Sequence, residues 1–363
     1  MKTIRRRLQR RAFRQPHWDT WVHLNNTEVK AKTTLIAILV LVAPLASGNC
    51  HAQDSAVALM YSRVGATDGA TTKTEEFENH LSHLSANNYQ VLPLPQIVAA
   101  LQIGAAVPEN AVAMTFDGGH ISIYREVWPR LKVLGFSFTV FIATDVIDSG
   151  GDDVMSWDHV RELSSSGVTI GTFGGGYKHL VALDEDEATA DITRANQRLM
   201  EEIGTAPELF AYPFGEYDAD LQRTIARHGY SAAFGQHSGV IYGNADYMAL
   251  PRFPLVGSYA NMPRFRTVVD TLPLPVTDVV PTDPVVTYNP PSLGFTVVGE
   301  VGPLENLACY LARFGKLNIE QLGPARIEVR FPDALPTGRN RVNCTLPGPG
   351  GRWRWFGLQL LVP

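Results

Sequence analysis

From residue 53 onward the sequence has little positive charge. The whole chain of 363 residues contains 31 Lys and Arg and 36 Asp and Glu, but residues 53–363 hold only 22 of the basic residues against 34 of the acidic ones. Such a surface repels phosphates, so we exclude nucleic acid as a partner and expect a neutral or cationic one. The sequence also lacks internal repeats and low-complexity tracts. Its 45% hydrophobic and 18% charged residues exclude a chain that is disordered throughout.

Long apolar segments are absent as well. The run Leu35–Ala43 is too short to span a bilayer. It follows Lys30 and Lys32 and leads through small residues to Ala52, which is the arrangement of a secretory signal peptide. We therefore expect residues 1–52 to be a signal-peptide region, the protein to be periplasmic or secreted, and the mature chain to have no transmembrane helix.

The expected start of translation is Val29, because about thirty residues precede the basic part of this segment and a signal peptide needs only a few. Residues 1–28 would then lie outside the protein. The alternative is a genuine long basic region that begins at Met1. Cys50 follows "SGN", which lacks the apolar residue of a lipid-attachment sequence, so we do not expect a lipid anchor.

Cysteine is scarce, with three residues in the whole chain. Removal of Cys50 with the signal segment would leave Cys309 and Cys344, an even pair in an exported chain. We expect a disulfide between them, closing a loop of about 35 residues. The alternative is two buried thiols.

Short apolar runs alternate with helical spacing over residues 53–271. Strands separated by helices in this rhythm predict parallel strands joined by right-handed crossovers, in an open sheet or a barrel. The strand-like runs are Ala56–Tyr61, Ala111–Phe116, Phe138–Ile142, Val168–Gly171 and Leu209–Pro213.

The pattern changes after about residue 271. Residues 272–292 are rich in proline and predict a linker or the entry to an edge strand. Residues 293–363 contain alternating runs with Gly and Pro turns, which predict a small all-β domain. Within it Trp353 and Trp355 share one face of an expected strand. We expect that face to point into a sandwich core, with a sugar-binding platform as the alternative.

Chemistry in a parallel α/β architecture sits where the strands end. Four such ends open into glycine-bearing loops, so each of them could line one cleft. The four segments are "MYSRVG" (60–65), "TFDGGH" (115–120), "IGTFGGGYKHL" (170–180) and "AYPFGEYD" (211–218).

These segments resemble the motifs of the polysaccharide deacetylase family (NodB-homology, carbohydrate esterase family 4). "TFDGGH" is similar to T-F-D-D-G-Y, and "IGTFGGGYKHL" is similar to I-G-x-H-T-x-x-H-P-x-L. "FAYPFGEY" is similar to the third motif, and "LMYSRVG" to an opening "MYHRV". The resemblance covers roughly residues 56–255. It implies an α/β fold, a distorted (β/α)7-type barrel, which the small all-β sandwich would follow.

The resemblance also implies the chemistry of each position. The family holds a divalent metal such as zinc with one Asp and two His, which activates water, while a second Asp accepts the proton. Asp117 matches that base, and Phe214 matches the residue whose backbone N–H holds the oxyanion. Gly118, Phe173 and Tyr177 stand where the three metal ligands should be. We therefore expect no cofactor and no metal.

Two alternatives keep catalysis. A relocated metal would use Asp117, His120 and His179 as ligands. A carboxylate pair would combine Asp117 with Glu216 or Asp158, as in glycoside hydrolysis.

Aromatic side chains at the strand ends suggest sugar binding, because their π faces stack on the C–H faces of sugar rings. The alternative is that these rings fill the space of the metal site. The expected substrate-binding residues are Tyr61, Phe173, Tyr177, Tyr212 and Glu216.

The sequence therefore predicts an exported protein of the polysaccharide deacetylase family, with a polysaccharide or oligosaccharide, N-acetylated in our hypothesis, as its partner. We expect a metal-free site that is weakly active or inactive. One alternative is an active carbohydrate hydrolase that uses Asp117 with a relocated metal or a second carboxylate. The other is an envelope assembly protein.

Overall fold

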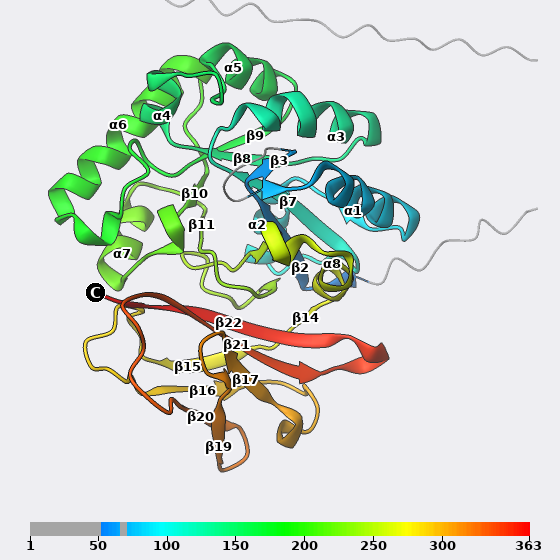
Figure 1. Cartoon of the computed structure of the whole chain (residues 1–363), viewed down its shortest axis with the longest axis vertical. Helices are drawn as coiled ribbons and strands as arrows, with labels where there is room; N and C mark the ends of the chain where they lie inside the picture. The colour runs from blue at the N-terminus through cyan, green and yellow to red at the C-terminus, as the bar shows by residue number, and fades with distance from the viewer. Residues whose placement is uncertain (1–51, 66–70) are drawn as a thin grey trace, which may run out of the picture. The chain divides into compact units, whose positions relative to one another are not determined.

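Residues 52–65 and 71–363 are described by the computed structural model of the chain (Figure 1). The expected signal-peptide region, the start at Val29 and the fate of Cys50 concern residues outside these ranges, so they stay predictions. No helix among the described residues is long and apolar enough to cross a membrane.

The larger sheet consists mainly of parallel strands, because buried strands of three to seven residues alternate with helices along the chain. Its order is β11-β10-β9-β8-β7-β2-β12, with β13 paired to β2 and β5 paired to β7. The long strands are β2 (Ser55–Tyr61), β7 (Ala111–Asp117), β8 (Thr139–Ile142), β9 (Thr169–Thr172), β10 (Leu209–Ala211) and β11 (Ala232–Phe234). The short strands of this sheet are β5 (Gln90–Val91), β12 (Ile241–Tyr242) and β13 (Phe253–Pro254). Two further pairs lie outside it, β1 (Ala52–Gln53) with β6 (Val107–Pro108) and β3 (Arg63–Val64) with β4 (Thr71–Thr72).

Helices follow the strands and cover the sheet, so apolar side chains from both faces of the strands are buried (Figure 1). The longest helix begins where Asp184 Oδ1 accepts the backbone N–H of Glu187 at 2.8 Å and ends at Gly204, which has the left-handed φ of 74°. The helices are α1 (Thr74–Ala86), α2 (Leu94–Gln102), α3 (Trp128–Leu134), α4 (Thr144–Ser149), α5 (Trp157–Ser165), α6 (Glu185–Ile203), α7 (Ala219–Arg227) and α8 (Met262–Val269).

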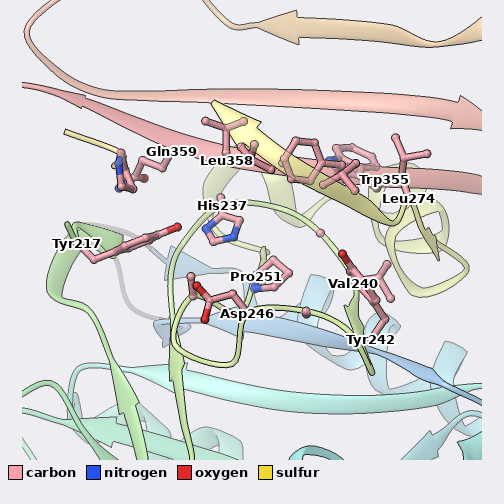
Figure 2. Close-up of a pocket in the computed structure, with 18 of the residues that line it drawn as sticks. Tyr217, His237, Val240, Tyr242, Asp246, Pro251, Leu274, Trp355, Leu358 and Gln359 are labelled. Atoms are coloured by element: carbon pink, nitrogen blue, oxygen red, sulfur yellow. The ribbon is translucent and has the colours of Figure 1, made fainter. Parts of the chain in front are cut away.

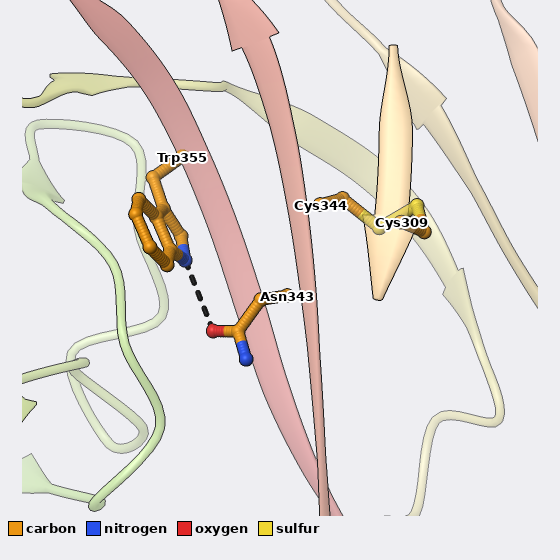
Figure 3. The surroundings of a disulfide bond; sticks show 4 residues. All are labelled: Cys309, Asn343, Cys344 and Trp355. Atoms are coloured by element: carbon orange, nitrogen blue, oxygen red, sulfur yellow. Dashed lines mark hydrogen bonds between the residues drawn. A yellow bond between two sulfur atoms is a disulfide. The ribbon is translucent and has the colours of Figure 1, made fainter. Parts of the chain in front are cut away.

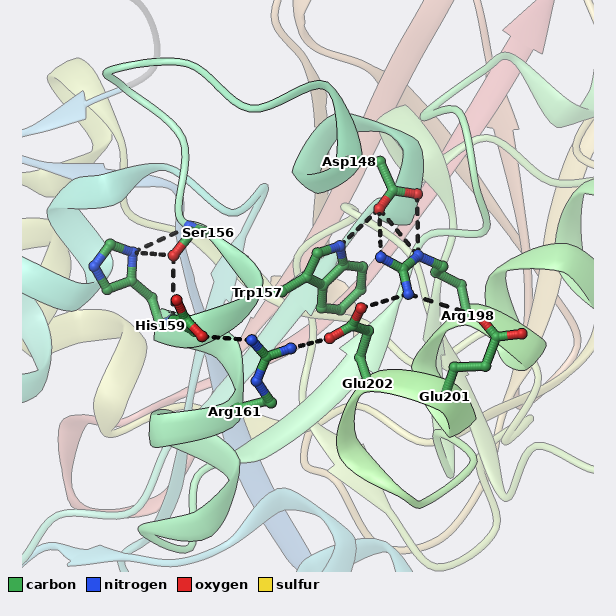
Figure 4. Close-up of polar contacts among 9 residues, drawn as sticks. Asp148, Ser156, Trp157, His159, Arg161, Arg198, Glu201 and Glu202 are labelled. Carbon is green, nitrogen blue, oxygen red and sulfur yellow. Dashed lines mark hydrogen bonds and ion pairs between the residues drawn. The ribbon is translucent and has the colours of Figure 1, made fainter.

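Charged side chains join α4, α5 and α6 on the outer surface (Figure 4). Arg198 donates from Nε to Asp148 Oδ1 at 3.0 Å and its guanidinium lies 4.7 Å from the ring centre of Trp157. Trp157 Nε1 donates to the same Asp148 oxygen at 2.7 Å. Glu202 accepts from Arg198 and from Arg161. This exposed network orients three helices but contributes little stability for each ion pair.

A β sandwich follows this α/β part of the chain. One sheet has the order β14-β22-β21-β17-β18 and the other β15-β16-β20-β19, and an apolar core lies between them. An α/β sheet followed by a small β sandwich is the predicted fold class, which is confirmed. The strands are β14 (Leu272–Pro273), β15 (Val276–Val280), β16 (Leu293–Val297), β17 (Ala308–Leu311), β18 (Gly315–Lys316), β19 (Asn318–Leu322), β20 (Arg326–Arg330), β21 (Gly338–Pro347) and β22 (Trp353–Val362).

The proline-rich stretch 272–292, which we expected to be a linker or the entry to an edge strand, supplies β14 and β15 to these two sheets. Prolines permit this because both strands lie at the edges of their sheets, where a missing N–H breaks no ladder.

The expected inward face of the last strand was wrong. Phe356, Leu358 and Leu360 pack into the sandwich core, so strand alternation directs Trp355 to the opposite face. There its ring packs edge-on against Phe253 of β13, with 5.4 Å between ring centres. The tryptophan face of β22 therefore binds the sandwich to the α/β part of the chain.

The predicted disulfide between Cys309 and Cys344 is confirmed (Figure 3). The two residues lie directly opposite each other on β17 and β21, with Cα atoms 4.0 Å apart, and both are buried. Because it closes a loop between residues 35 apart in sequence, the bond restricts the unfolded chain.

Replacing both cysteines with alanine should lower the free energy of unfolding by about 3–4 kcal/mol, the chain-entropy value for a loop of this length. Urea unfolding of the variant and of the wild-type protein, each with and without reductant, measures the difference. Reductant should lower the stability of the wild-type protein alone. Equal stability of all four samples would show that the disulfide contributes nothing.

A buried histidine on α1 gives the fold a pH dependence. His80 has one ring nitrogen 3.1 Å from the Tyr61 hydroxyl and the other 2.7 Å from the Ala260 carbonyl oxygen, and its ring stacks on Phe265. Burial lowers the pKa of His80 to about 4. The folded protein therefore keeps this ring neutral at pH values where the unfolded chain takes up a proton.

We expect the free energy of unfolding to fall by about 2 kcal/mol through His80 when the pH drops from 7 to 5, because the histidine of the unfolded chain, with a pKa of about 6.5, takes up a proton in this range and the buried ring does not. The loss begins near the unfolded pKa and is complete below the folded one. His80→Gln, which keeps polar atoms but does not titrate, should flatten the stability profile by that amount. Parallel profiles for the two proteins, measured by urea unfolding at both pH values, would contradict this.

Candidate functional site

Asp117 ends β7 and forms a buried ion pair with Arg252. Its two carboxylate oxygens accept hydrogen bonds from Arg252, one from Nη1 at 2.6 Å and one from Nη2 at 2.9 Å. Asp117 is 5% exposed and Arg252 0%. Arg252 also donates to the Gly235 carbonyl at 3.1 Å and to the Thr115 hydroxyl at 3.2 Å. The guanidinium of Arg252 thus links the end of β7 to the loop that follows β11.

The electrostatics of Asp117 follow from this position. Burial raises the pKa of the Asp117 carboxyl, whereas the charge and hydrogen bonds of Arg252 and a hydrogen bond from Gln236 act to lower it. Both oxygens are engaged in this arrangement. A proton from an attacking water would have to be accepted by an oxygen that already binds Arg252, so the role of Asp117 as a general base stays a prediction.

The second and third motifs bring aromatic rings together beside this pair. Phe173, which is 0% exposed, packs edge-on against Tyr177 with ring centres 5.0 Å apart. Tyr177 in turn lies 4.8 Å from Phe214. Gly118 has a φ of 112°, a conformation that residues with a Cβ rarely adopt. Rings therefore line the position at which the resemblance implies metal ligands.

Tyr177 is half-buried beside Phe214 and close to Asp117. Burial raises the pKa of Tyr177 to about 12, and the charge of Asp117 acts in the same direction, whereas the backbone of Phe214 acts to lower it. The predicted role of the Phe214 N–H in holding an oxyanion stays a prediction.

Residues at the rim form a second polar group. His179 Nδ1 lies 2.6 Å from Glu216 Oε2, and its ring stacks on Phe214 at 4.2 Å. Arg339 of β21 places Nε 3.6 Å from Glu216 Oε1 and its guanidinium 5.4 Å from the ring centre of Phe214. Gln359 of β22 donates to the Gly215 carbonyl at 2.8 Å. The sandwich therefore contributes side chains to the third-motif loop.

The structure brings Asp117, Phe173, Tyr177, Phe214 and Glu216 together and leaves Tyr61 and Tyr212 out. Tyr61 is 0% exposed and stacks on Phe116 at 5.2 Å. Tyr212 is also 0% exposed and donates its hydroxyl to the Met248 carbonyl at 2.8 Å. Neither side chain presents a surface to a glycan, because both point from the strand ends into the core. Phe173, which is 0% exposed, and Glu216, which is 5% exposed, are buried as well, so among the expected substrate-binding residues Tyr177 alone is partly exposed.

The side chains present do not fit a divalent metal. Glycine and phenylalanine offer no donor, and a neutral tyrosine is not among the side chains that usually hold zinc. Within residues 52–65 and 71–363 no three His, Cys, Asp or Glu side chains are grouped to hold an ion. His120 Nδ1 contacts the Ser122 hydroxyl at 2.8 Å and His179 binds Glu216. The alternative of a relocated metal is therefore not supported.

The alternative carboxylate pair is not supported either. Glu216 contacts His179 and Arg339. Asp158 lies on the surface in α5 and pairs with Arg161. Each candidate partner of Asp117 is thus engaged elsewhere.

Sequence reasoning missed Arg252, Gln236 and the residues of the sandwich that reach the site. Arg252 stands in "LPRFPL", at the end of the range 56–255 that the resemblance covers, and an arginine there was the available signal. Arg339 and Gln359 come from strands more than 120 residues beyond the third motif. No local pattern predicts such contacts.

A cavity of about 410 Å³ separates β22 from the loops that follow β11 (Figure 2). His237 lines it, is buried, and has an Nδ1 without a hydrogen-bond partner among the described residues. Burial lowers the pKa of His237 to about 4, so the ring is neutral at physiological pH. Tyr217, Tyr242 and Trp355 lie around the same space.

The sequence matches known deacetylases. Residues 104–233 match the family model described as polysaccharide deacetylase. The putative polysaccharide deacetylase YxkH of Bacillus subtilis is 22% identical over 194 residues, 53% of this chain and 69% of that protein. The poly-beta-1,6-N-acetyl-D-glucosamine N-deacetylase of Escherichia coli K12 is 21% identical over 56% of this chain but only 36% of that protein. The resemblance is confirmed, and the chain contains a polysaccharide deacetylase domain.

Solved structures support the same fold. A deacetylase of Streptococcus pyogenes, PplD, solved with acetate, matches 59% of this chain and 98% of its own with a TM-score of 0.56 and 18% identity. IcaB from Ammonifex degensii matches 60% of this chain and 97% of its own with a TM-score of 0.54 and 22% identity. At these identities the match establishes the fold alone.

Asp117→Asn should lower the free energy of unfolding by about 3–5 kcal/mol, because it leaves the buried charge of Arg252 unpaired. Combining it with Arg252→Gln should cost less than the sum of the two single changes. Asp158→Asn is the matched control, since its ion pair is exposed and contributes less than about 1 kcal/mol. If Asp117→Asn lowers the free energy of unfolding, measured with urea, no more than this control does, the ion pair with Arg252 does not stabilise the fold.

Proposed function

We propose that this chain, which contains a polysaccharide deacetylase domain, is an exported protein that binds an acetylated polysaccharide and has weak or no deacetylase activity. One observation carries the proposal. Glycine, phenylalanine and tyrosine stand at positions 118, 173 and 177, where the resemblance implies metal ligands. The rings of Phe173 and Tyr177 contact each other there and fill space that an ion would need.

Hydrolysis of an acetamide at neutral pH requires an activated water and a group that stabilises the oxyanion. In a metal-dependent deacetylase a metal supplies both. Here no metal ligand stands at positions 118, 173 and 177, and the carboxylate of Asp117 is held by the positive charge of Arg252. A general base without a metal to activate the water or stabilise the oxyanion supports weak or absent catalysis.

Sugar binding is supported by the side chains around the rim. Phe214 and Tyr177 are partly exposed, and aromatic faces stack on the C–H faces of sugar rings. His179 and Arg339, which both contact the buried carboxylate of Glu216, add polar groups beside these rings for hydroxyl and acetamide groups. Two relatives are poly-beta-1,6-N-acetyl-D-glucosamine N-deacetylases, so polymers of N-acetylglucosamine are the first ligands to test.

Export is supported by the disulfide between Cys309 and Cys344, because such bonds persist in oxidising compartments. The expected signal-peptide region, residues 1–52, agrees with a periplasmic or secreted location.

Protein that begins at Gln53 should bind no stoichiometric zinc in calorimetry. Acetate release from oligomers of β-1,6-linked N-acetylglucosamine should be at least about 10²- to 10³-fold lower than that of the Escherichia coli relative assayed alongside, because loss of oxyanion stabilisation alone costs that much. The same oligomers should bind saturably.

Zinc binding at one-to-one stoichiometry would contradict the proposal. Acetate release that disappears in Asp117→Asn but not in Asp158→Asn would also contradict it and favour an active hydrolase. If the protein neither releases acetate nor binds a glycan, a protein partner recovered by crosslinking would favour an assembly role instead.

A further inference from the structure

A second cavity lies between the sandwich and the α/β part of the chain and shares Trp355 with the cavity of Figure 2. Its volume is about 280 Å³, just below the roughly 300–1,000 Å³ of small-molecule sites. It has room for one sugar residue rather than for a long segment of chain. The side chains that define it are Tyr259, Arg264, Tyr310, Arg341, Asn343 and Trp355.

Two arginines in this cavity have no acidic partner among the described residues. Arg264 of α8 has a buried Nε without a hydrogen-bond partner, and no carboxylate pairs with its guanidinium. Arg341 of β21 donates only to neutral amides, from Nε to Gln359 Oε1 at 2.9 Å and from Nη2 to Gln236 Oε1 at 3.0 Å. Burial is the main cause that lowers the pKa of each group, yet an arginine stays charged at neutral pH. The cavity therefore holds two positive charges that nothing in it neutralises.

Two tyrosines on its rim are unusually exposed. Tyr259, in the 3-10 turn Gly257–Ala260, is 50% exposed, and Tyr310 of β17 is 42% exposed. They come from the two different parts of the chain and line the same cavity. Exposed aromatic side chains at a cavity are typical of ligand sites.

The aromatic and cationic groups are layered. The guanidinium of Arg264 lies 4.9 Å from the ring centre of Tyr259 and 5.9 Å from that of Trp355. The Trp355 indole donates from Nε1 to Asn343 Oδ1 at 3.0 Å, which fixes the orientation of its ring (Figure 3). Rings on several sides of a charge suit a ligand with both an anionic group and an apolar face.

Local charge agrees with this chemistry although the mature chain is acidic as a whole. Residues 272–363, which form the sandwich, contain eight Lys and Arg and seven Asp and Glu, whereas residues 53–271 contain 14 and 27. An anion that the α/β part repels therefore meets much less repulsion at the face where the sandwich lies.

We infer that this cavity is a binding site for a sugar residue that bears an oxyanion, with a carboxylate between Arg264 and Arg341 and the sugar ring against Tyr259 and Tyr310. The inference rests on the proposed glycan-binding function and adds that the polysaccharide carries acidic sugar residues. Arg341 connects the site to Asp117 through Gln236, which hydrogen-bonds to both. One extended glycan would then contact both the third-motif rim and this cavity.

Calorimetry with a galacturonic acid trimer tests the site, with the methyl-esterified trimer as the uncharged ligand of the same ring structure. The charged trimer should bind and the ester should not, and affinity should fall as salt increases. Arg264→Gln should weaken binding about 10- to 100-fold, the effect of losing a hydrogen bond to a charged group. Tyr310→Ser should weaken it about 2- to 10-fold.

Matched controls lie elsewhere on the sandwich. Arg330→Gln removes an exposed arginine of β20, and Tyr288→Ser removes a tyrosine that is 83% exposed. Both should leave affinity within about twofold. Circular dichroism of each variant separates loss of binding from loss of folding, and Tyr310→Ser, at an exposed rim position, keeps the test meaningful if Arg264→Gln does not fold.

Four results would overturn the inference. Equal binding of the trimer and its ester would show that no oxyanion is recognised. Equal losses in Arg330→Gln and Arg264→Gln would place binding on general surface charge, and inorganic phosphate binding as tightly as the trimer would leave only a bare anion site. N-acetylglucosamine oligomers that bind wild type and Arg264→Gln alike, with no binding of galacturonate, would refute the acidic-sugar site while the proposed function stands.

Discussion

The ion pair between Asp117 and Arg252 is the contact on which the rest of the site depends. Removing two opposite charges from water is expensive, and only close, fully bonded geometry compensates for it. The guanidinium meets this requirement with two bonds to the carboxylate and further bonds to Gly235 and Thr115. It thereby joins β7, the end of β11 and the segment before β13. Aromatic side chains can pack against this neutral unit where an isolated charge would exclude them.

The fold could be predicted from the sequence because its signals are local. Apolar runs separated by segments with helical spacing predict parallel strands. The two cysteines that remain after residue 52, Cys309 and Cys344, predict a disulfide between them. The site was predicted only in part. An aromatic residue at a strand end can face a cleft or the core, and Tyr61 and Tyr212 face the core. Arg341 is far from its partners in the sequence, so only the folded chain reveals that it reaches the site.

The sandwich takes part in the surroundings of the site rather than only following it. Its strands β21 and β22 hydrogen-bond to the third-motif loop and to Gln236. Successive side chains of β22 point to opposite faces of its sheet. One face completes the sandwich core, and the other carries Trp355 and Gln359 toward the α/β part. Sequence patterns alone favoured the opposite assignment of these faces.

The backbone at Gly118 bears on how such a site changes over evolutionary time. With φ at 112°, the turn after β7 has a shape that glycine adopts freely and that an aspartate adopts only under strain. A mutation that placed a carboxylate at this position would therefore be selected against for stability before any ion could reward it. Neighbouring changes would have to reshape the turn first, so a single substitution here does not give the chain a metal ligand without a loss of stability.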